Sequence, residues 1–539
     1  MHMTLKAFAR TLTACAVAAL CTFSWSCGGD KSVGPTATQL AFTVGPADTT
    51  GGATLRTLKV EARDANGNVA ATYSGSITVA LGSNASGATL AGTTSKAAVS
   101  GVATFADLSV DKVGAGYTLT AAASGLTGTT SIAFNITLGP PAKFGFGTLP
   151  SSVTAGAGIV PVTVSAQDLG GNLTPAFTGN VTVAIAAGTT GATLSGTTTR
   201  AAVSGVAAFP NLSIDKSGAS YTLSAASTGV TTGTSAAFAI AAGPAVQLAF
   251  TVQPSATVAG TAIASVKVAA QDALGNTVTG FASTITVAIT SGTGTAGATL
   301  AGTTTSSPTN GVATFAGLSI DKAGRTSSGT GYTLTATSGA LPAGTSDPFD
   351  INVGPPSTLA FTTPPVTAAA GAGFAPLVEV SARDAAGNVV TTFTGTVTVA
   401  IGTNPTGASL SGTTAIAAVS GVATFPTIRI NQVGAGYTLS ASATGIAAAA
   451  SGAFAITPGP AAALVFTAQP VTTSDAVPIS PAVRVTARDA FGNDATQFVG
   501  NVTMAIASNP SAGTLSGTTT LAASAGVASF DSLVIDNIG

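Results

Sequence analysis

The stretch from Leu58 to Asn68, LKVEARDANGN, decides the fold of this chain. Over its first six residues, Leu58–Arg63, apolar side chains alternate with charged ones. A period of two is typical of a β-strand that buries one face. The last five residues, Asp64–Asn68, contain Asp, Gly and Asn, which favour tight turns. The stretch therefore predicts a half-buried strand that ends in a turn.

The same pattern returns four more times along the chain. Its Asp recurs at intervals of 104, 104, 112 and 105 residues, at Asp64, Asp168, Asp272, Asp384 and Asp489. Gly-Pro pairs separate the copies, at Gly139-Pro140, Gly243-Pro244, Gly354-Pro355 and Gly459-Pro460. Recurrence at a fixed period indicates tandem domains. We predict five, called repeats 1 to 5, at residues 39–139, 140–243, 244–354, 355–459 and 460–539.

Each repeat of about 105 residues contains seven or eight short alternating segments bounded by Gly, Asn and Ser. This spacing predicts an all-β chain of tandem immunoglobulin-like Greek-key β-sandwiches. The sequence of repeat 5 stops before the segment that begins at Gly116 in repeat 1. We therefore expect repeat 5 to be incomplete and the sequence to be the N-terminal piece of a longer chain.

The order of three motifs points to a family. Asp-x-x-Gly-Asn is followed by GVATF (Gly101–Phe105) and then by GYTLTA (Gly116–Ala121). This order resembles the bacterial immunoglobulin-like domains of invasin and intimin type, over residues 39–539. The resemblance implies a β-sandwich module, used in stalks, adhesin arms and accessory domains, and it implies no particular activity.

The composition excludes several classes of function. Only 7% of residues are charged, and 18 basic residues balance 19 acidic ones, so no basic patch predicts nucleic-acid binding. Beyond residue 27 the sequence has neither His nor Cys, so it offers no Ser-His-Asp or Cys-His arrangement. We therefore predict a protein that is not an enzyme and that needs no cofactor or metal.

The N-terminus reads as an export signal. Lys6 and Arg10 precede a short apolar run, Thr11–Phe23, which is typical of a secretory signal peptide. We assign residues 1–26 to this signal and 27–38 to a flexible anchor linker. The context of Cys27 resembles a bacterial lipoprotein signal, which implies a lipid anchor as the only membrane contact. The protein is then expected at the cell envelope or surface, as an outer-membrane lipoprotein, or secreted if Cys27 is not lipidated.

The recurring Asp-x-x-Gly-Asn has three readings: a turn, a weak or shared calcium site, or a ligand contact. A calcium-binding loop supplies most of the six to eight oxygen ligands of the ion, whereas Asp64–Asn68 contains one side-chain carboxylate and two side-chain amides. We interpret the motif as a structural turn. Its residues are Asp64, Gly67, Asn68, Asp168, Gly171, Asn172, Asp272, Gly275, Asn276, Asp384, Gly387, Asn388, Asp489, Gly492 and Asn493.

Three other features of the repeats invite a functional reading. The pair Asp111-Lys112 recurs with loss of charge in later copies, which suggests an exposed loop pair. The tyrosines resemble a tyrosine corner, with an aromatic sugar-binding platform as the alternative; they are Tyr117, Tyr221, Tyr332 and Tyr437. Repeat 3 has a longer loop between Asp321 and Tyr332, either a binding loop or a tolerated insertion.

These observations favour a non-enzymatic bacterial surface protein, an adhesin-type stalk or presentation rod. Its ligand would be an extracellular protein or polysaccharide, which the sequence does not identify. The alternative is an accessory or spacer region of a larger secreted enzyme or carbohydrate-binding protein. A third hypothesis is self-association stiffened by calcium.

Overall fold

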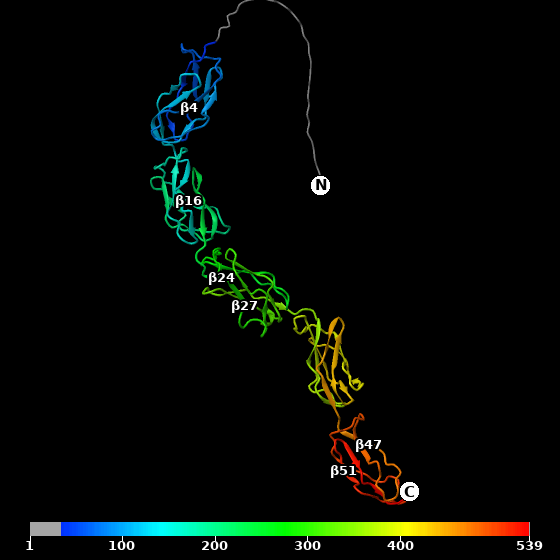
Figure 1. Ribbon diagram of the computed structural model, residues 1–539. Coiled ribbons are helices and arrows are strands. Elements are labelled where there is room, and N and C mark those ends of the chain that lie inside the picture. Colours follow the sequence, from blue (N-terminus) through cyan, green and yellow to red (C-terminus); the bar gives the residue numbers. More distant parts are fainter. Residues whose placement is uncertain (1–33, 538–539) are drawn as a thin grey trace, which may run out of the picture. The chain divides into compact units, whose positions relative to one another are not determined.

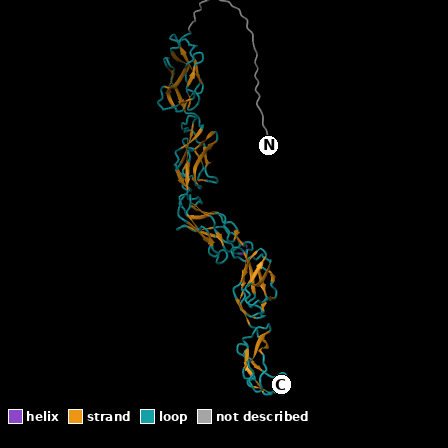
Figure 2. Cartoon of the chain, turned by 45° about the vertical axis from the view of Figure 1, so that its right-hand side comes forward, coloured by secondary structure: helices purple, strands orange, loops and turns teal. Residues whose placement is uncertain are grey.

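The computed structural model describes residues 34–537, and the chain divides into two compact units, 1–240 and 241–539. Cys27 and the predicted signal peptide lie outside the described residues. Within residues 34–537 the only helix is a 3₁₀ turn, η1 (Thr326–Ser328), in the long loop of repeat 3. Everything else is strand, turn or loop (Figure 2). The predicted all-β fold of immunoglobulin-like sandwiches is confirmed.

Repeat 1 shows the arrangement most clearly, and its strand β4 is labelled in Figure 1. One sheet has the order β1-β3-β7 and the other β11-β10-β4-β6. A third, short sheet, β2-β12-β9, and the pair β5-β8 complete the repeat. Its strands are β1 (Gln39–Val44), β2 (Thr49–Thr50), β3 (Leu58–Arg63), β4 (Ser76–Leu81), β5 (Leu90–Ala91), β6 (Ser95–Ala97), β7 (Val102–Phe105), β8 (Ser109–Val110), β9 (Gly114–Tyr117), β10 (Leu119–Ala122), β11 (Thr129–Thr130) and β12 (Phe134–Thr137).

Repeats 2 and 3 reuse this order of strands. Repeat 2 has β13 (Lys143–Phe146), β14 (Ser152–Thr154), β15 (Val162–Gln167), β16 (Asn180–Ala187), β17 (Leu194–Ser195), β18 (Thr199–Ala201), β19 (Val206–Phe209), β20 (Ser213–Ile214), β21 (Gly218–Ser227), β22 (Val230–Thr234) and β23 (Phe238–Ala241). Repeat 3 has β24 (Gln247–Val252), β25 (Thr257–Val258), β26 (Val266–Gln271), β27 (Ile285–Ile289), β28 (Leu300–Ala301), β29 (Thr305–Ser306), β30 (Val312–Phe315), β31 (Ser319–Ile320), β32 (Leu334–Thr337), β33 (Gly344–Thr345) and β34 (Ile351–Asn352).

Repeats 4 and 5 begin alike and then differ. Repeat 4 has β35 (Thr358–Thr363), β36 (Ala368–Ala369), β37 (Val378–Arg383), β38 (Thr396–Ile401), β39 (Leu410–Ser411), β40 (Ala415–Ala417), β41 (Val422–Phe425), β42 (Arg429–Ile430), β43 (Gly434–Tyr437), β44 (Leu439–Ala443), β45 (Ile446–Ala450) and β46 (Phe454–Thr457). Repeat 5 has β47 (Ala461–Ala468), β48 (Val483–Asp489), β49 (Asn501–Thr503), β50 (Leu515–Ser516), β51 (Thr520–Ala522), β52 (Val527–Phe530) and β53 (Val534–Ile535).

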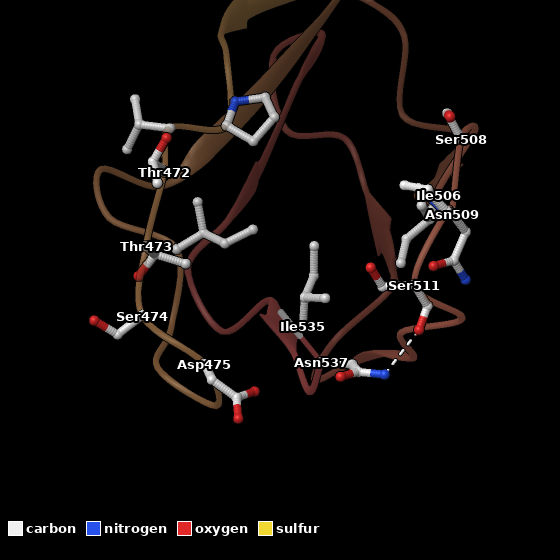
Figure 3. Close-up of a pocket in the computed structure, with 14 residues that line it drawn as sticks. Thr472, Thr473, Ser474, Asp475, Ile506, Ser508, Asn509, Ser511, Ile535 and Asn537 are labelled. Atoms are coloured by element: carbon white, nitrogen blue, oxygen red, sulfur yellow. Dashed lines mark hydrogen bonds between the residues drawn. The ribbon is translucent and has the colours of Figure 1, made fainter. Parts of the chain in front are cut away.

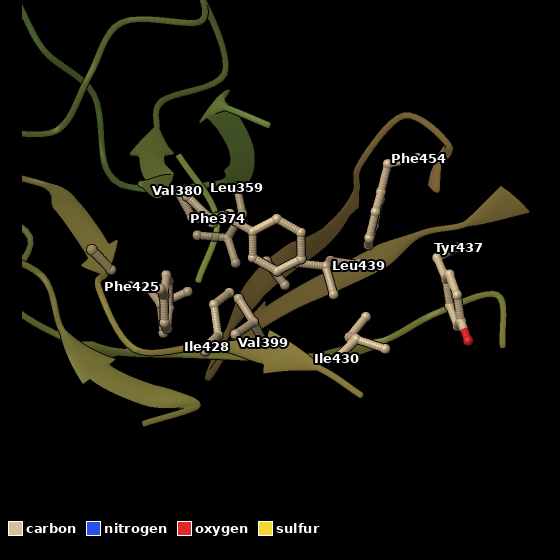
Figure 4. Packing of buried hydrophobic residues seen from close by; sticks show 14 of the residues in the cluster. Leu359, Phe374, Val380, Val399, Phe425, Ile428, Ile430, Tyr437, Leu439 and Phe454 are labelled. Carbon is tan, nitrogen blue, oxygen red and sulfur yellow. The ribbon is translucent and has the colours of Figure 1, made fainter. Parts of the chain in front are cut away.

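The apolar face of each sandwich forms its own core. Among residues 34–537, the buried hydrophobic side chains form five separate clusters, each inside one predicted repeat. In β3 the predicted inward residues Leu58, Val60 and Ala62 are fully buried. In repeat 4 aromatic and aliphatic side chains from both sheets meet between the layers (Figure 4). No helix in the described part is both long and apolar enough to cross a bilayer.

Candidate functional site

In repeat 1 the Asp-x-x-Gly-Asn motif forms a compact turn. The side-chain Oδ1 of Asp64 accepts the backbone N–H groups of Asn66 (2.9 Å) and Asn68 (2.8 Å). The N–H of Gly67 donates to the carbonyl of Asp64, at 3.1 Å. Gly67 has φ +87°, a left-handed conformation that glycine adopts without strain. The side chain of Asn68 is exposed and donates to Asp64 Oδ2 (3.2 Å).

In later repeats the same Asp is buried and holds the last residue of the preceding repeat. The exposed fraction is 0 to 3% for Asp168, Asp272, Asp384 and Asp489. The second carboxylate oxygen, Oδ2, accepts the N–H of the glycine in the Gly-Pro pair between the repeats. The distances are 3.2 Å for Gly139, 2.8 Å for Gly243, 2.9 Å for Gly354 and 3.0 Å for Gly459. The carboxylate therefore joins the turn to the linker.

The Asn of the motif reaches back to the preceding repeat. In unit 1, Asn172 Nδ2 donates to the carbonyl of Asp111 (2.7 Å), and its Oδ1 accepts the N–H of Val113 (3.3 Å). In unit 2 the same two bonds join Asn388 to Asp321 O (3.0 Å) and Ala323 N (3.0 Å), and Asn493 to Asn431 O (2.8 Å) and Val433 N (3.2 Å). A side-chain amide thus pairs with a loop backbone much as a peptide group would.

We call this set of groups the junction lock: the Asp and Asn of the turn, the linker glycine, and the loop backbone of the preceding repeat. It is present with all its parts at the junctions of repeats 1 and 2, 3 and 4, and 4 and 5. The lock recognises main-chain atoms. This explains why Asp111-Lys112 is replaced by Asn431-Gln432 in repeat 4 while the junction keeps the same bonds.

The loop that the Asn binds is also hydrogen-bonded within its own repeat, by the recurring tyrosine. The tyrosine hydroxyl donates to a carbonyl of this loop, at 2.8 to 3.0 Å in each repeat: Tyr117 to Lys112 O, Tyr221 to Lys216 O, Tyr332 to Lys322 O and Tyr437 to Gln432 O. The four rings are at most 1% exposed. The tyrosine-corner interpretation describes these contacts, and the sugar-platform alternative is wrong because buried rings offer no platform.

The loop pair itself differs from the sequence expectation. Asp111 is half-buried, and its Oδ1 accepts the N–H of Thr89 at 2.6 Å. Asp321 and Asp536 make the same bond to Thr299 and Thr514. The pair is therefore only partly an exposed one, because the Asp caps a neighbouring turn while its backbone faces the next repeat.

Small residues let the repeats approach at the lock. Gly170 N donates to Gly51 O at 3.0 Å, and a Cβ built on Gly51 would lie 2.5 Å from Asn172 Nδ2 and 2.7 Å from Asp168 Oδ2. A Cβ on Gly52, which has φ +75°, would lie 2.3 Å from Gly170 N. No side chain fits between these backbones, so the two glycines are required at this junction.

The packing partner changes from one junction to the next. Gly260, at φ +74°, faces Ala386, where a Cβ would lie 3.3 Å from the alanine Cβ. Gly371, at φ +75°, faces the ring of Phe491, where a Cβ would lie 2.0 Å away. The facing residue is always the second x of Asp-x-x-Gly-Asn, which is Gly, Ala or Phe in turn. Each junction thus has its own steric match.

At Asp272 and Asp489 the surroundings favour an ionised carboxylate. For Asp489, burial raises the pKa, but hydrogen bonds from the Asn493 side chain and from the N–H groups of Gly459, Phe491 and Asn493 outweigh it and hold the pKa below its usual value. The pKa of Asp272 is lowered by the same balance. In residues 34–537 no three acidic, His or Cys side chains lie together as a metal site. The geometry suits a mechanical joint.

The long loop of repeat 3 is folded onto its own repeat. Thr326 N donates to Asp350 Oδ1 at 2.7 Å, and Gly324 pairs with Ile351. Together with Val390–Thr392 of repeat 4, this loop lines a shallow groove that includes Arg325. The residues that line this groove include no cluster of acidic, His or Cys side chains. Both readings of the loop, a binding loop and a tolerated insertion, agree with these contacts.

Sequence reasoning placed the turns and missed what they bind. The lock partners of Asn172 lie about 60 residues earlier in the chain and are backbone atoms. One signal could have found them. The turn, the Gly-Pro pair and the Asp-Lys loop recur with one period, as expected of segments that meet at every junction.

The comparisons with known proteins concern the fold alone. No protein-family model matches the chain, and no curated protein matches it. Among solved structures, InvD of Yersinia pseudotuberculosis is 19% identical over 58% of this chain and 98% of that chain, with a TM-score of 0.24. Drosophila N-cadherin EC1-4 is 12% identical over 70% of this chain and 91% of that chain, with a TM-score of 0.20.

Parts of larger proteins also match. A β-glycosidase from Bacteroides vulgatus is 12% identical over 38% of this chain, with a TM-score of 0.18. Escherichia coli α-2-macroglobulin is 11% identical over 86% of this chain, with a TM-score of 0.21. The chain spans 25% of the length of the first and 47% of the second. At these scores the likenesses carry no argument about function.

Proposed function

We propose that this protein is a non-enzymatic bacterial surface protein, a stalk that presents a binding partner away from the cell envelope. Its repeats are of the bacterial immunoglobulin-like type, and lipidated Cys27 is its anchor. The observation that carries the proposal is the junction lock. The most conspicuous recurring polar group of the chain is used to join repeats, with the same bonds at three junctions.

A stalk needs joints that resist bending, and each lock resists it in two ways. The Asp carboxylate ties the linker glycine to the turn, and the Asn amide ties the turn to the preceding loop. Charge-assisted hydrogen bonds from backbone N–H groups to a buried carboxylate are among the stronger ones. A linker that begins with Gly-Pro has few other conformations available, because proline fixes φ. The joint is therefore pre-organised on both sides.

The first test is mechanical. The full chain is imaged by electron microscopy beside the triple variant Asn172→Ala, Asn388→Ala and Asn493→Ala. We expect extended particles of uniform length for the wild type and bent, variable particles for the variant. A wild-type chain as flexible as the variant would contradict the stalk.

The second test concerns location. Cells that express the protein are fractionated with and without Cys27→Ala, and intact cells are treated with protease. We expect the wild type in the membrane fraction and accessible to protease, and the variant in the medium or periplasm. Release of the wild type into the medium would instead favour the alternative, a spacer region of a secreted enzyme or carbohydrate-binding protein.

A further inference from the structure

Repeat 3 has a shallow groove of about 470 Å³ on the outer face of its sheet β24-β26-β30. Strand β24 is labelled in Figure 1. Six hydroxyl side chains, Lys267 and Val312 line the groove, and no acidic or aromatic side chain is among them. Its volume falls within the range of sites for small ligands. We call it the hydroxyl groove.

The hydroxyl groove is open because the strand at its edge stops early. In repeats 1, 2, 4 and 5 the position of Pro308 is an alanine, whose N–H donates to the carbonyl of a glycine just before the neighbouring strand. In repeat 4 this bond joins Ala418 N to Gly395 O at 3.0 Å. Proline has no N–H, so repeat 3 cannot form it. Strand β29 therefore ends at Ser306, one residue earlier than in the other repeats, and Ser307 lines the groove.

Two threonines of the hydroxyl groove stand where other repeats have different side chains. Thr277 and Thr309 both line the groove. In repeat 5 the first position is Asp494, whose carboxylate pairs with Arg488 at 3.4 Å. The same two positions are aliphatic in repeats 1, 2 and 4: Val69 with Val99, Leu173 with Val203, and Val389 with Val419. The fold thus tolerates aliphatic side chains here, and only repeat 3 has a hydroxyl at both positions.

The polar groups of the hydroxyl groove are not used inside the described part of the chain. Lys267 is exposed and belongs to neither of the two ion pairs found within residues 34–537. Five of the hydroxyls make no side-chain hydrogen bond there, namely those of Thr277, Ser306, Ser307, Thr309 and Thr314. One cation and several hydroxyls are therefore available to a ligand.

Repeat 4 shows what this sheet face can hold. Glu379 occupies the position of Lys267, and its carboxylate accepts the hydroxyls of Thr363 (3.1 Å) and Thr424 (3.4 Å). Thr314 pairs with Lys267 across the strands as Thr424 pairs with Glu379. Repeat 4 thus places its own carboxylate between hydroxyls. Repeat 3 keeps a hydroxyl and has a lysine where the carboxylate would be.

Charge distinguishes the hydroxyl groove from a hollow of about 320 Å³ in repeat 5. There the only charged lining residue is Asp475, and Asn537 Nδ2 donates to Ser511 O at 2.7 Å across the rim (Figure 3). A carboxylate in the lining repels an anion, whereas the ammonium of Lys267 attracts one. Of these two hollows, only the hydroxyl groove suits an anionic ligand.

We propose that the hydroxyl groove binds a carboxylated sugar, the uronate unit of an acidic polysaccharide. The carboxylate lies against Lys267 and Thr314, and the ring hydroxyls exchange hydrogen bonds with Thr277 and Thr309. Sugar hydroxyls both donate and accept, as threonine and serine hydroxyls do. An acidic peptide fits less well, because only Val312 offers an aliphatic wall for its side chains. This inference goes beyond the proposed stalk and stands without it.

The first test uses the full chain and a panel of oligosaccharides made of galacturonate, glucuronate or mannuronate units. Isothermal titration calorimetry should show saturable binding of at least one of them, at one site per chain, and weaker binding at higher ionic strength. The methyl ester of the same oligosaccharide has no charge. It should bind at least about tenfold more weakly, a loss of at least about 1.4 kcal/mol.

Variants of Lys267 locate the carboxylate. Lys267→Gln should weaken binding at least about tenfold, and Lys267→Arg should recover most of the loss because it restores the charge. The matched control is Lys59→Gln, at the same position of repeat 1 and also exposed. It should leave binding unchanged.

Two further variants test the hydroxyls and the shape of the groove. The double variant Thr277→Val and Thr309→Val should fold normally, since repeats 1 and 4 have valine at both positions, and should bind at least about tenfold more weakly. Pro308→Ala supplies the missing N–H, so β29 should lengthen as in the other repeats and binding should weaken. Thermal unfolding checks that each variant is folded.

Three results would overturn the proposal. One is no saturable binding of any uronate oligosaccharide in the panel. Another is equal binding to the wild type, to Lys267→Gln and to the threonine double variant, which would place the site elsewhere. The third is binding of inorganic phosphate or of a hexaglutamate peptide at least as tight as that of the oligosaccharide. It would make a free anion or an acidic peptide the ligand.

Discussion

Two turns in the first unit, Asp64–Asn68 and Asp168–Asn172, have the same motif but different contacts. Both close with the Asp Oδ1 on the N–H of the Asn, at 2.8 Å in repeat 1 and 2.9 Å in repeat 2. In the second turn the Asp is fully buried, and the Asn side chain binds the loop of repeat 1. In the first turn the Asn side chain is exposed. The motif therefore folds by itself, and a neighbouring repeat turns it into a joint.

The comparison separates two contributions to stability, one from the hydrogen bonds inside the turn and one from those across the junction. The bonds inside the turn belong to local sequence, and the bonds across the junction belong to context. A substitution at the same motif position in repeats 1 and 2 removes the first contribution from both and the second from only one. Matched pairs of variants in the full chain can therefore measure the junction alone.

The largest effect is expected for Asp168→Ala. It removes the acceptor for Gly139 N, Asn172 N and Asn172 Nδ2 in a buried site. Leaving such donors unpaired should lower the local free energy of opening by about 3 kcal/mol. Hydrogen exchange at Gly139 and Asn172 measures it. Asp64→Ala should change exchange much less, and equal losses in the two repeats would show that the junction adds nothing.

Gly52→Ala should be next. Its Cβ would meet Gly170 backbone atoms, so the junction has to open, and φ +75° adds strain of about 1–2 kcal/mol. The matched control is Gly67→Ala, which has a similar φ and no atom within 4 Å of its Cβ. Distances between spin labels on repeats 1 and 2 should broaden for Gly52→Ala alone. Broadening for both variants would assign the effect to strain.

Asn172→Ala should loosen the joint without disturbing the turn's main chain. It loses the bonds to Asp111 O and Val113 N, worth about 1–2 kcal/mol together. The same spin-label distances should broaden, whereas Asn68→Ala should leave them unchanged. Unchanged distances in Asn172→Ala would mean that the glycine contacts alone hold the repeats.

Tyr117→Phe tests whether the Tyr117 hydroxyl stabilises the loop of repeat 1 that Asn172 binds. Loss of the hydroxyl bond to Lys112 O should cost repeat 1 about 1 kcal/mol. The double variant with Asn172→Ala should cost less than the sum of the two singles if the tyrosine and the lock act through one loop. Additive losses in thermal unfolding would separate the two features.

The smallest effect near neutral pH concerns titration of Asp489. Its folded pKa is lowered, so its stabilising contribution is present above the unfolded value of about 3.9 and is lost as pH falls through the folded value. The protection of the Gly459 N–H against hydrogen exchange, relative to its intrinsic rate at each pH, should therefore fall below about pH 4. Asp64 also has a lowered pKa, chiefly through the Asn68 N–H. Acid should open that turn without moving any repeat.

Much of the fold was predictable from residues 58–68. The alternation of Leu58, Val60 and Ala62 identified the buried face of β3, and these side chains are fully buried. The turn at Asp64–Asn68 was predictable from its residue types, because Gly67 can adopt the positive φ that this turn contains. Such features depend on neighbours in sequence, and the period of the repeats multiplied the evidence.

The lock was not predictable in the same way. Its acceptors and donors at Asp111 and Val113 are main-chain atoms, which every residue has, so no residue type marks them, and the shared period of turn, linker and loop is the one signal that points to them. The longer loop of repeat 3 could be located but not assigned, because its folding onto Asp350 depends on tertiary contacts. Lipidation of Cys27 and continuation of the chain beyond Gly539 stay predictions.

A joint formed by hydrogen bonds to backbone atoms has a consequence for how such repeat proteins evolve. Duplication of a repeat supplies a turn at one end and a loop at the other, so the new copy carries one half of the joint with each of its neighbours. Drift at loop positions, such as Asn431 in place of Asp321, leaves the carbonyl where it was. Unequal recombination can therefore lengthen or shorten this protein by whole repeats while the backbone bonds of each joint are kept, and only the residue that faces the junction glycine has to be matched again.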